Sequence, residues 1–264
     1  MSIFFKILLA IRSIKNFWLV PFDLFGLIKS DFVYHSRCGI KTIVRGGTSD
    51  YSEIVIIHSD SEYPKRYYPA NNPSLILDLG ANIGSFTTYV INNLLKKGIR
   101  PIVYAIEPNK SNYKLLKRNV SLNNYKNFVV MSRCAISQKN GTGFLVKNNK
   151  NYDDLYLSSK KNINTEEVRV FSLENYCKNN KIKHIDLLKM DIEGEEYCVL
   201  KSSIEFLKKN VLSLFVEAHN FDKKRNIRVL KQIFRKNNFE ILFEVFNRTI
   251  FVRNLTFIKN EEYS

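Results

Sequence analysis

The stretch from Leu75 to Phe86 constrains the fold more than any other part of this 264-residue chain. A short apolar run meets an acid and then two glycines, Gly80 and Gly84. Such a run is typical of a strand buried on both faces of a parallel sheet. From Phe86 the apolar residues recur at helical spacing up to Gly98, where a glycine is expected to end the helix. The stretch therefore predicts a strand, a glycine turn and a helix of the nucleotide-binding kind.

The residues of the turn indicate which cofactor it accepts. A dinucleotide site favours G-x-G-x-x-G, but Asn82 takes the place of the middle glycine and Asp78 stands at the strand end. A carboxylate there would repel a pyrophosphate, whereas it suits S-adenosylmethionine, which carries ammonium and sulfonium charges and no phosphate. Glu107 follows the next strand, where an acid can accept hydrogen bonds from both ribose hydroxyls. We predict that S-adenosylmethionine is the cofactor and that these residues bind it: Asp78, Gly80, Asn82, Gly84, Glu107 and Asp191.

The chain is strongly basic, with 41 Lys and Arg against 25 Asp and Glu and a formal net charge of +16. That charge is compatible with nucleic acid, anionic lipid or acidic glycan as a partner. The lysines are spread along the chain, however, whereas binding faces gather their charge. A general enrichment in lysine is therefore the better explanation. The four cysteines show neither C-x-x-C nor zinc spacing, which favours reduced thiols in a cytoplasmic protein.

The first 28 residues are rich in apolar and aromatic side chains that charges interrupt. No stretch approaches the ~20 apolar residues of a spanning helix, and no cleavage site of a signal peptide follows. Apolar residues from Ile3 to Trp18 share one helical face, which predicts an amphipathic helix. This helix packs on its own domain or a partner, or residues 3–28 make peripheral membrane contact.

The order of elements predicts an α/β protein with a doubly wound, mostly parallel sheet. The segment 59–73 contains three prolines and separates a helix-and-strand extension, residues 1–70, from a cofactor-binding domain, residues 71–264. Residues 139–164 are polar and are expected to form a hairpin insertion or flap. The chain should finish in an antiparallel hairpin. Strands are expected at 39–45, 54–58, 102–106, 127–131, 168–173, 185–190, 211–216, 240–246 and 249–257.

Polar side chains follow two further strands of the predicted sheet. Asp191 and Glu193 come after the strand 185–190, and Glu217 and His219 come at the end of the strand 211–216. Open α/β sheets bind ligands at the carboxyl ends of their strands, so these side chains should line one site. Glu195 and Glu196 are expected only to complement the dipole of the next helix.

Three stretches together resemble the FkbM family of S-adenosylmethionine-dependent methyltransferases: residues 76–84, Glu107-Pro108 and residues 186–196. The similarity extends over about residues 39 to 220, and includes Arg45 to Asp50, Tyr63, Asn119 and Asn123. Its most specific part is Lys189-Met190-Asp191-Ile192-Glu193-Gly194. The resemblance implies a Rossmann-like class I methyltransferase sheet. It also implies O-methylation of a hydroxyl on a sugar, glycan, glycolipid or polyketide-type metabolite.

Methylation of a hydroxyl calls for a base, because an alcohol is a poor nucleophile until its proton is removed. His219 and Asp191 are the candidate bases, and Glu193 completes the catalytic set. Glu217 and Lys189 are candidates for substrate contacts. A divalent cation between Asp191 and Glu217 would suit its preference for oxygen ligands, but the sequence offers no firm ligand set for a metal.

The main alternative is a nucleic-acid methyltransferase, which would use the basic surface. Against it, Asp191-Ile192-Glu193-Gly194 is not the Asn/Asp-Pro-Pro-aromatic signature of base amino-methylases, and clustered acids repel a phosphate backbone. A dehydrogenase is disfavoured by Asn82, and a non-catalytic module would leave the acids without a purpose. We expect a small-molecule or glycan acceptor rather than nucleic acid. No sequence feature predicts an oligomeric state.

Overall fold

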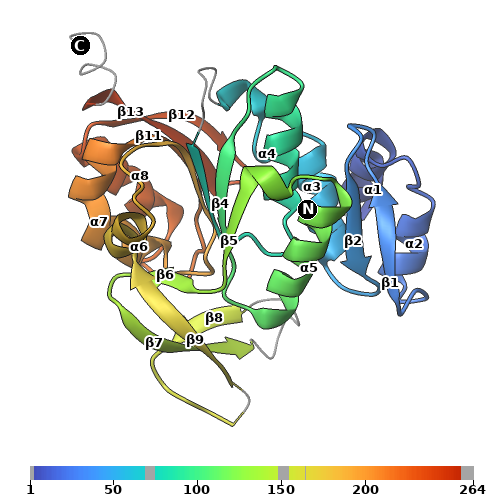
Figure 1. The fold of residues 1–264 in the computed structure, drawn as a ribbon, viewed down its shortest axis with the longest axis horizontal. Coiled ribbons are helices and arrows are strands. Elements are labelled where there is room, and N and C mark those ends of the chain that lie inside the picture. The colour runs from blue at the N-terminus through green and yellow to red at the C-terminus, as the bar shows by residue number, and fades with distance from the viewer. Residues whose placement is uncertain (1–2, 69–74, 148–154, 164, 257–264) are drawn as a thin grey trace.

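The computed structural model describes residues 3–68, 75–147, 155–163 and 165–256. Its centre is a seven-stranded sheet in the order β12-β13-β11-β10-β3-β4-β5 (Figure 1). The strands from β11 to β5 run parallel, and β13 pairs antiparallel with β11 and β12. The prediction of a mostly parallel α/β sheet with a C-terminal antiparallel hairpin is confirmed. The strands are β3 (Leu75–Leu79), β4 (Ile102–Ile106), β5 (Val129–Ser132), β10 (Ile185–Met190), β11 (Val211–Glu217), β12 (Phe239–Val245) and β13 (Thr249–Asn254).

Helices cover both faces of the central sheet. On one face α4 (Ser85–Leu95) and α5 (Lys110–Leu122) pack with the inward side chains of β3 and β4. On the other face lie α6 (Leu173–Asn179), α7 (Glu196–Asn210) and α8 (Ile227–Lys236). All six residues of β10 are buried. Burial on both faces explains why the parallel strands are nearly continuous apolar runs.

A separate two-stranded sheet precedes the central one. It pairs β1 (Asp31–His35) antiparallel with β2 (Lys41–Arg45), and α5 holds its edge. The Asn119 side chain accepts the Ile43 N–H at 2.7 Å and donates to the Ile43 carbonyl at 3.1 Å. Asn123 pairs in the same way with Lys41. The extension is thus joined by side-chain hydrogen bonds to the domain that follows, and the division at residue 70 stays a prediction.

The expected strand over residues 54–58 is wrong, because this stretch belongs to α3 (Asp50–His58). Ile54, Val55 and Ile57 are buried, so the helix shows no polar face that would reveal its period. A short apolar run cannot be assigned from periodicity alone. The acids Asp50 and Glu53 in the first turn are the signal that favours a helix here.

The amphipathic helix expected from Ile3 to Trp18 ends early: α1 (Ile3–Ser13) covers its first part, residues 15–18 form a turn, and α2 (Leu19–Leu24) begins after Trp18. Leu9, Ala10 and Ile14 face the interior with residues of α3 and β2. Other members of the predicted apolar face, such as Leu8 and Trp18, are exposed. None of the helices in the described part of the chain is both long and apolar enough to cross a bilayer.

The expected hairpin insertion is a four-stranded sheet of order β6-β9-β7-β8, which lies below the central sheet in Figure 1. Its hairpin pairs β7 (Gly141–Lys147) antiparallel with β8 (Leu155–Ser158), while residues 148–154 lie outside the described chain. β6 (Ala135–Ser137) and β9 (Thr165–Ser172) connect the hairpin to the core. The hairpin therefore belongs to a sheet with a small core of its own.

Candidate functional site

The glycine turn after β3 brings two strand ends into direct contact. Gly80 has φ +75°, and a Cβ at this position would overlap the carbonyl oxygen of Asp191. Gly84 has φ +92°, and a Cβ there would lie 2.7 Å from the Leu116 side chain on α5. Only glycine combines this backbone conformation with so close an approach. The turn therefore fixes Asp191 beside the start of α4.

We expect Gly80→Ala to destabilise the fold at least about twice as much as Gly98→Ala. Both glycines have nearly the same φ, +75° and +76°, but a Cβ on Gly98 meets nothing within 4 Å. Gly98→Ala therefore costs only the left-handed conformation, ~1–2 kcal/mol, whereas Gly80→Ala adds a clash with backbone. Urea denaturation of both variants measures the difference. Equal losses of unfolding free energy would contradict the close packing at Gly80.

A pocket opens at the carboxyl ends of β3, β4 and β10, and its volume of about 740 Å³ includes space open to solvent. Polar groups from Asn82, Glu107 and Asp191 line it, and Leu145 and Leu157 of the small sheet lie opposite. The lining residues are Leu79, Gly80, Asn82, Ile106, Glu107, Pro108, Asn109, Asn112, Cys134, Ala135, Ile136, Leu145, Leu155, Leu157, Asp191, Ile192, Glu193 and Glu195.

Glu107 is held at the end of β4 by two backbone amides. One carboxylate oxygen accepts the Asn82 N–H at 2.8 Å and the other accepts the Asn109 N–H at 2.9 Å. Burial raises the pKa of Glu107 to about 7, although these amides partly oppose the rise. Each oxygen keeps a lone pair for a ligand. The Asn82 side chain donates to Glu53 of α3 at 2.6 Å, and its own oxygen is buried and has no hydrogen-bond partner among the described residues.

Lys189 lies beneath the glycine turn and is only 3% exposed. Its Nζ donates to the Gly80 carbonyl at 2.7 Å and lies 3.4 Å from Asp78 Oδ1 and 3.3 Å from Asp191 Oδ2. Burial would lower the pKa of Lys189, but the surrounding carboxylates outweigh burial and raise it. Asp78 is fully buried and also accepts the Thr87 hydroxyl at 2.5 Å. Neither side chain lines the pocket, so both act on it through Asp191 and the turn.

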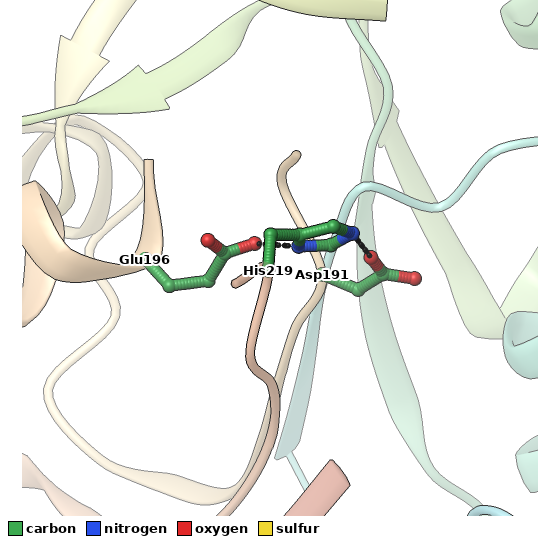
Figure 2. Close-up of side chains that lie close together, drawn as sticks. All are labelled: Asp191, Glu196 and His219. Carbon is green, nitrogen blue, oxygen red and sulfur yellow. Dashed lines mark hydrogen bonds and ion pairs between the residues drawn. The ribbon is translucent and has the colours of Figure 1, made fainter. Parts of the chain in front are cut away.

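His219 stands between two carboxylates, as Figure 2 shows. Its Nδ1 lies 2.9 Å from Glu196, a fully buried acid at the start of α7 that also accepts the Ile192 N–H. Its Nε2 lies 3.8 Å from Asp191 and 3.3 Å from Glu193. Glu196 thus fixes the ring so that Nε2 points toward the strand ends. The expectation that Glu196 only complements the dipole of α7 is therefore wrong, because its carboxylate also contacts the His219 ring.

The carboxylates around His219 keep its ring charged. Burial would lower the pKa of His219, but Glu196, Asp191 and Glu193 outweigh burial and raise the pKa to about 10. Asp191 shows the reverse effect: burial would raise its pKa, yet Lys189 and His219 lower it below the usual value. At neutral pH in the free protein His219 is therefore an imidazolium. It becomes a base only where positive charge brought into the site lowers its pKa.

The same residues are also a candidate metal site. Asp191, Glu196 and His219 offer ligand atoms within 4.8 Å of one another. In the structure Glu196 and Asp191 meet opposite nitrogens of the ring (Figure 2). A divalent cation between Asp191 and Glu217 would compete with Arg248, because Glu217 Oε1 is 2.8 Å from its guanidinium.

A second polar group lies beside His219 at the end of β11. Glu217 is buried; its carboxylate accepts the Tyr63 hydroxyl at 3.3 Å and pairs with Arg248 from the β12–β13 turn. Arg248 also pairs with the buried Glu62 at 3.2 Å and remains 45% exposed. Burial raises the pKa of Glu217 well above its usual range. Arg248 is the exposed hydrogen-bond donor of this group.

The predicted site residues thus fall into three positions. Glu107, Asn82, Gly80, Asp191 and Glu193 line the pocket. Asp78, Gly84 and Lys189 lie beneath or behind the turn. Glu217 ends the neighbouring strand β11, and His219 follows it and lies beside Asp191.

Sequence reasoning missed the partners of these residues that come from distant segments. Glu53, Glu62 and Arg248 each reach the site from outside the four strand ends that carry it. Of these three residues, Glu53 carried a local signal, because it is an acid in the first turn of a helix. Glu196 carried the same signal.

Comparisons with known proteins identify the family. The model of the methyltransferase FkbM domain matches residues 78–242, more than half of the chain. Methyltransferase sdnD of Sordaria araneosa is 32% identical over 167 residues, 51% of this chain and 63% of that protein. Methyltransferase 1 of Beauveria bassiana is 28% identical over 171 residues, 56% of this chain and 67% of that protein. The chain thus spans less than two thirds of the length of the first of these relatives.

Solved structures are more distant. A methyltransferase FkbM from Methylobacillus flagellatus superposes with a TM-score of 0.48 at 15% identity, covering 77% of this chain and 53% of that chain. A SAM-dependent methyltransferase from Agrobacterium tumefaciens gives 0.49 at 10% identity, covering 85% and 69%. On the family match over residues 78–242, the chain belongs to the FkbM methyltransferase family.

Proposed function

We propose that this protein is an S-adenosylmethionine-dependent O-methyltransferase that acts on a hydroxyl of a sugar, glycan, glycolipid or related metabolite. The observation that carries the proposal is the pocket at the ends of β3, β4 and β10. It has a backbone-anchored carboxylate, Glu107, on one side and Asp191 and Glu193 beside His219 on the other. This arrangement suits a cofactor with a ribose at one end and a cationic centre at the other.

The residues present fit S-adenosylmethionine. Glu107 offers two oxygens to the ribose hydroxyls. The unpartnered oxygen of Asn82 offers an acceptor beside it, and Ala135, Ile136 and Leu145 provide an apolar wall for an adenine ring. The acids at the turn suit sulfonium and ammonium charges and would repel a pyrophosphate. When bound, this cofactor supplies a methyl group for in-line displacement.

The chain's own residues would orient the acceptor and take its proton. Glu196 holds the His219 ring, and Nε2 faces Asp191 and Glu193 at the edge of the pocket. The positive charges that the cofactor brings lower the pKa of His219 from its value of about 10. The neutral ring then accepts the acceptor's hydroxyl proton at Nε2. Asp191 stabilises the imidazolium that forms, and orientation of the hydroxyl supplies much of the rate.

The surroundings of His219 favour a neutral, hydroxyl-rich acceptor. Phe221 is 52% exposed, and its ring centroid lies 6.4 Å from that of His219. An exposed aromatic ring beside the base provides an apolar surface for a sugar face. Arg248 offers donors to acceptor oxygens nearby. Asp191, Glu193 and Glu195 at the pocket would repel the phosphates of a nucleic acid.

The first test is calorimetric titration of the protein with S-adenosylmethionine, with NAD as the control ligand. We expect saturable binding of S-adenosylmethionine alone. We also expect the affinity to rise as pH increases through about 7, because an ionised Glu107 accepts both ribose hydroxyls and a protonated one does not. Glu107→Gln should weaken binding by about ten- to a hundredfold and remove this pH dependence. A folded protein that binds no S-adenosylmethionine would refute the proposal.

A further inference from the structure

The first 27 residues present an unusual amount of exposed apolar surface. Fifteen large apolar side chains are exposed in the described residues, and nearly half of them lie in this short segment. Scattered exposed apolar residues are normal, but gathered ones mark a site of interaction. We call this set the apolar N-terminal surface: Phe5, Leu8, Ile11, Trp18, Phe22, Phe25 and Leu27.

The helices that carry this surface are firmly attached to the protein. Leu9 of α1, Ile14 directly after it and Val20 of α2 are buried on the opposite side. Asp23 is buried as well and accepts the Tyr34 hydroxyl at 3.1 Å and the Gly47 N–H at 2.6 Å. The exposed side chains therefore do not belong to a loose helix that could turn them inward. The helices α1 and α2 lie at one end of the molecule (Figure 1).

The exposed charges of residues 3–30 are all positive, and the next acid, Asp31, pairs with Arg118. Between residues 3 and 30 the only acid is Asp23, which is 1% exposed. Arg12, Lys15 and Lys29 are exposed, and Lys6 is partly exposed. Aromatic and aliphatic side chains ringed by cations match the acyl boundary and headgroups of an anionic bilayer. Trp18, at 58% exposure, is of the residue type that prefers this boundary.

We propose that the apolar N-terminal surface docks the protein onto a membrane that contains anionic lipid. The exposed side chains of α1 and α2 enter the acyl boundary, and Arg12, Lys15 and Lys29 pair with headgroup phosphates. Docking of this kind is peripheral. The docking proposal does not depend on which acceptor is methylated. Docking would bring the enzyme close to hydroxyls of lipid-linked molecules.

Trp18 provides a direct measurement, because it is the chain's only tryptophan. We expect its emission to shift to shorter wavelength when the full chain meets vesicles of phosphatidylcholine with phosphatidylserine. Vesicles of phosphatidylcholine alone should give a much smaller shift, and added salt should weaken binding. An emission that neither vesicle changes would overturn the proposal.

Variants tested by vesicle sedimentation distinguish membrane binding from binding of another partner at this surface. Phe22→Ser/Phe25→Ser and Arg12→Gln/Lys15→Gln should each lose about tenfold or more in vesicle affinity. Tyr156→Ser/Ile163→Ser removes exposed apolar side chains of the small sheet and should bind as wild type does. Phe25→Ser alone, at a 78% exposed position, guards against misfolding of the double variant. If light scattering shows instead a dimer that Phe22→Ser/Phe25→Ser dissociates, with no vesicle binding, a second copy covers the surface and the proposal is wrong.

Discussion

Replacing His219 with asparagine is expected to lower methyl-transfer turnover by about 10²- to 10⁴-fold without lowering S-adenosylmethionine affinity. The reason is the position of the ring: His219 Nε2 faces the acids at the pocket edge, whereas the proposed ribose contacts, Glu107 and Asn82, lie at another part of the pocket. Transfer of labelled methyl groups to the acceptor that wild type modifies measures turnover, and calorimetry measures cofactor affinity.

The same variant tests the protonation state of the ring. In wild type, kcat/KM for S-adenosylmethionine should rise with pH toward about 10, because His219 is protonated below that value in the free protein and only the neutral ring accepts a proton. The His219→Asn variant should lose this rise. Wild-type turnover in the variant, or a pH profile that falls where wild type should rise, would assign the proton transfer to another group.

The raised pKa of His219 can also be tested without a methyl acceptor, through the pH dependence of folding stability. Because the pKa of His219 is raised to about 10 in the folded protein, above the ~6.5 of an unfolded chain, its charge stabilises the fold. This contribution is complete below about pH 6.5 and is lost as the pH rises through about 10. Urea denaturation across this range should show a decline in wild type that His219→Asn reduces.

The core of the site was predictable because its signals are local. A buried parallel strand must be apolar on both faces, so Leu75–Leu79 and Ile185–Met190 could be recognised from composition alone. Gly80 and Gly84 mark backbone that no other residue can adopt there. Asn109 is a residue type that favours helix N-caps, and its side chain accepts the N–H groups of Ser111 and Asn112 at the start of α5.

The remaining parts of the site depend on contacts between distant segments. Glu62 reaches Arg248 across 186 positions of sequence, and Tyr63 reaches Glu217 across 154. No local pattern encodes such pairings, because they follow from how the finished sheet places its ends. The expected strand over 54–58 failed for a related reason: tertiary burial on several sides of α3 hides its helical period. With that helix misassigned, Glu53 could not be placed beside Asn82.

Because Lys189 is buried, replacing it is expected to have the largest effect on stability. Lys189→Met should lower the free energy of unfolding by about 3–5 kcal/mol, because it leaves the buried Asp78 carboxylate without a cation. Lys208→Met is the matched control. Lys208 lies 3.1 Å from Glu205, but that pair is on the surface, with side chains 27% and 68% exposed, and should contribute at most about 1 kcal/mol.

Asp78→Asn in the Lys189→Met background tests the electrostatic cause. If uncompensated charge is responsible, the second substitution restores part of the lost stability, although alone it destabilises the native protein. A lower pH should also reduce the stability loss caused by Lys189→Met. Burial already raises the pKa of Asp78, and loss of Lys189 raises this pKa further, so Asp78 is protonated more readily in the variant. A protonated Asp78 leaves no buried charge, so Lys189→Met should lose less stability at pH 5 than at pH 8. If the loss is the same at both pH values and Asp78→Asn gives no relief, Lys189 acts through packing and its hydrogen bond to Gly80 instead.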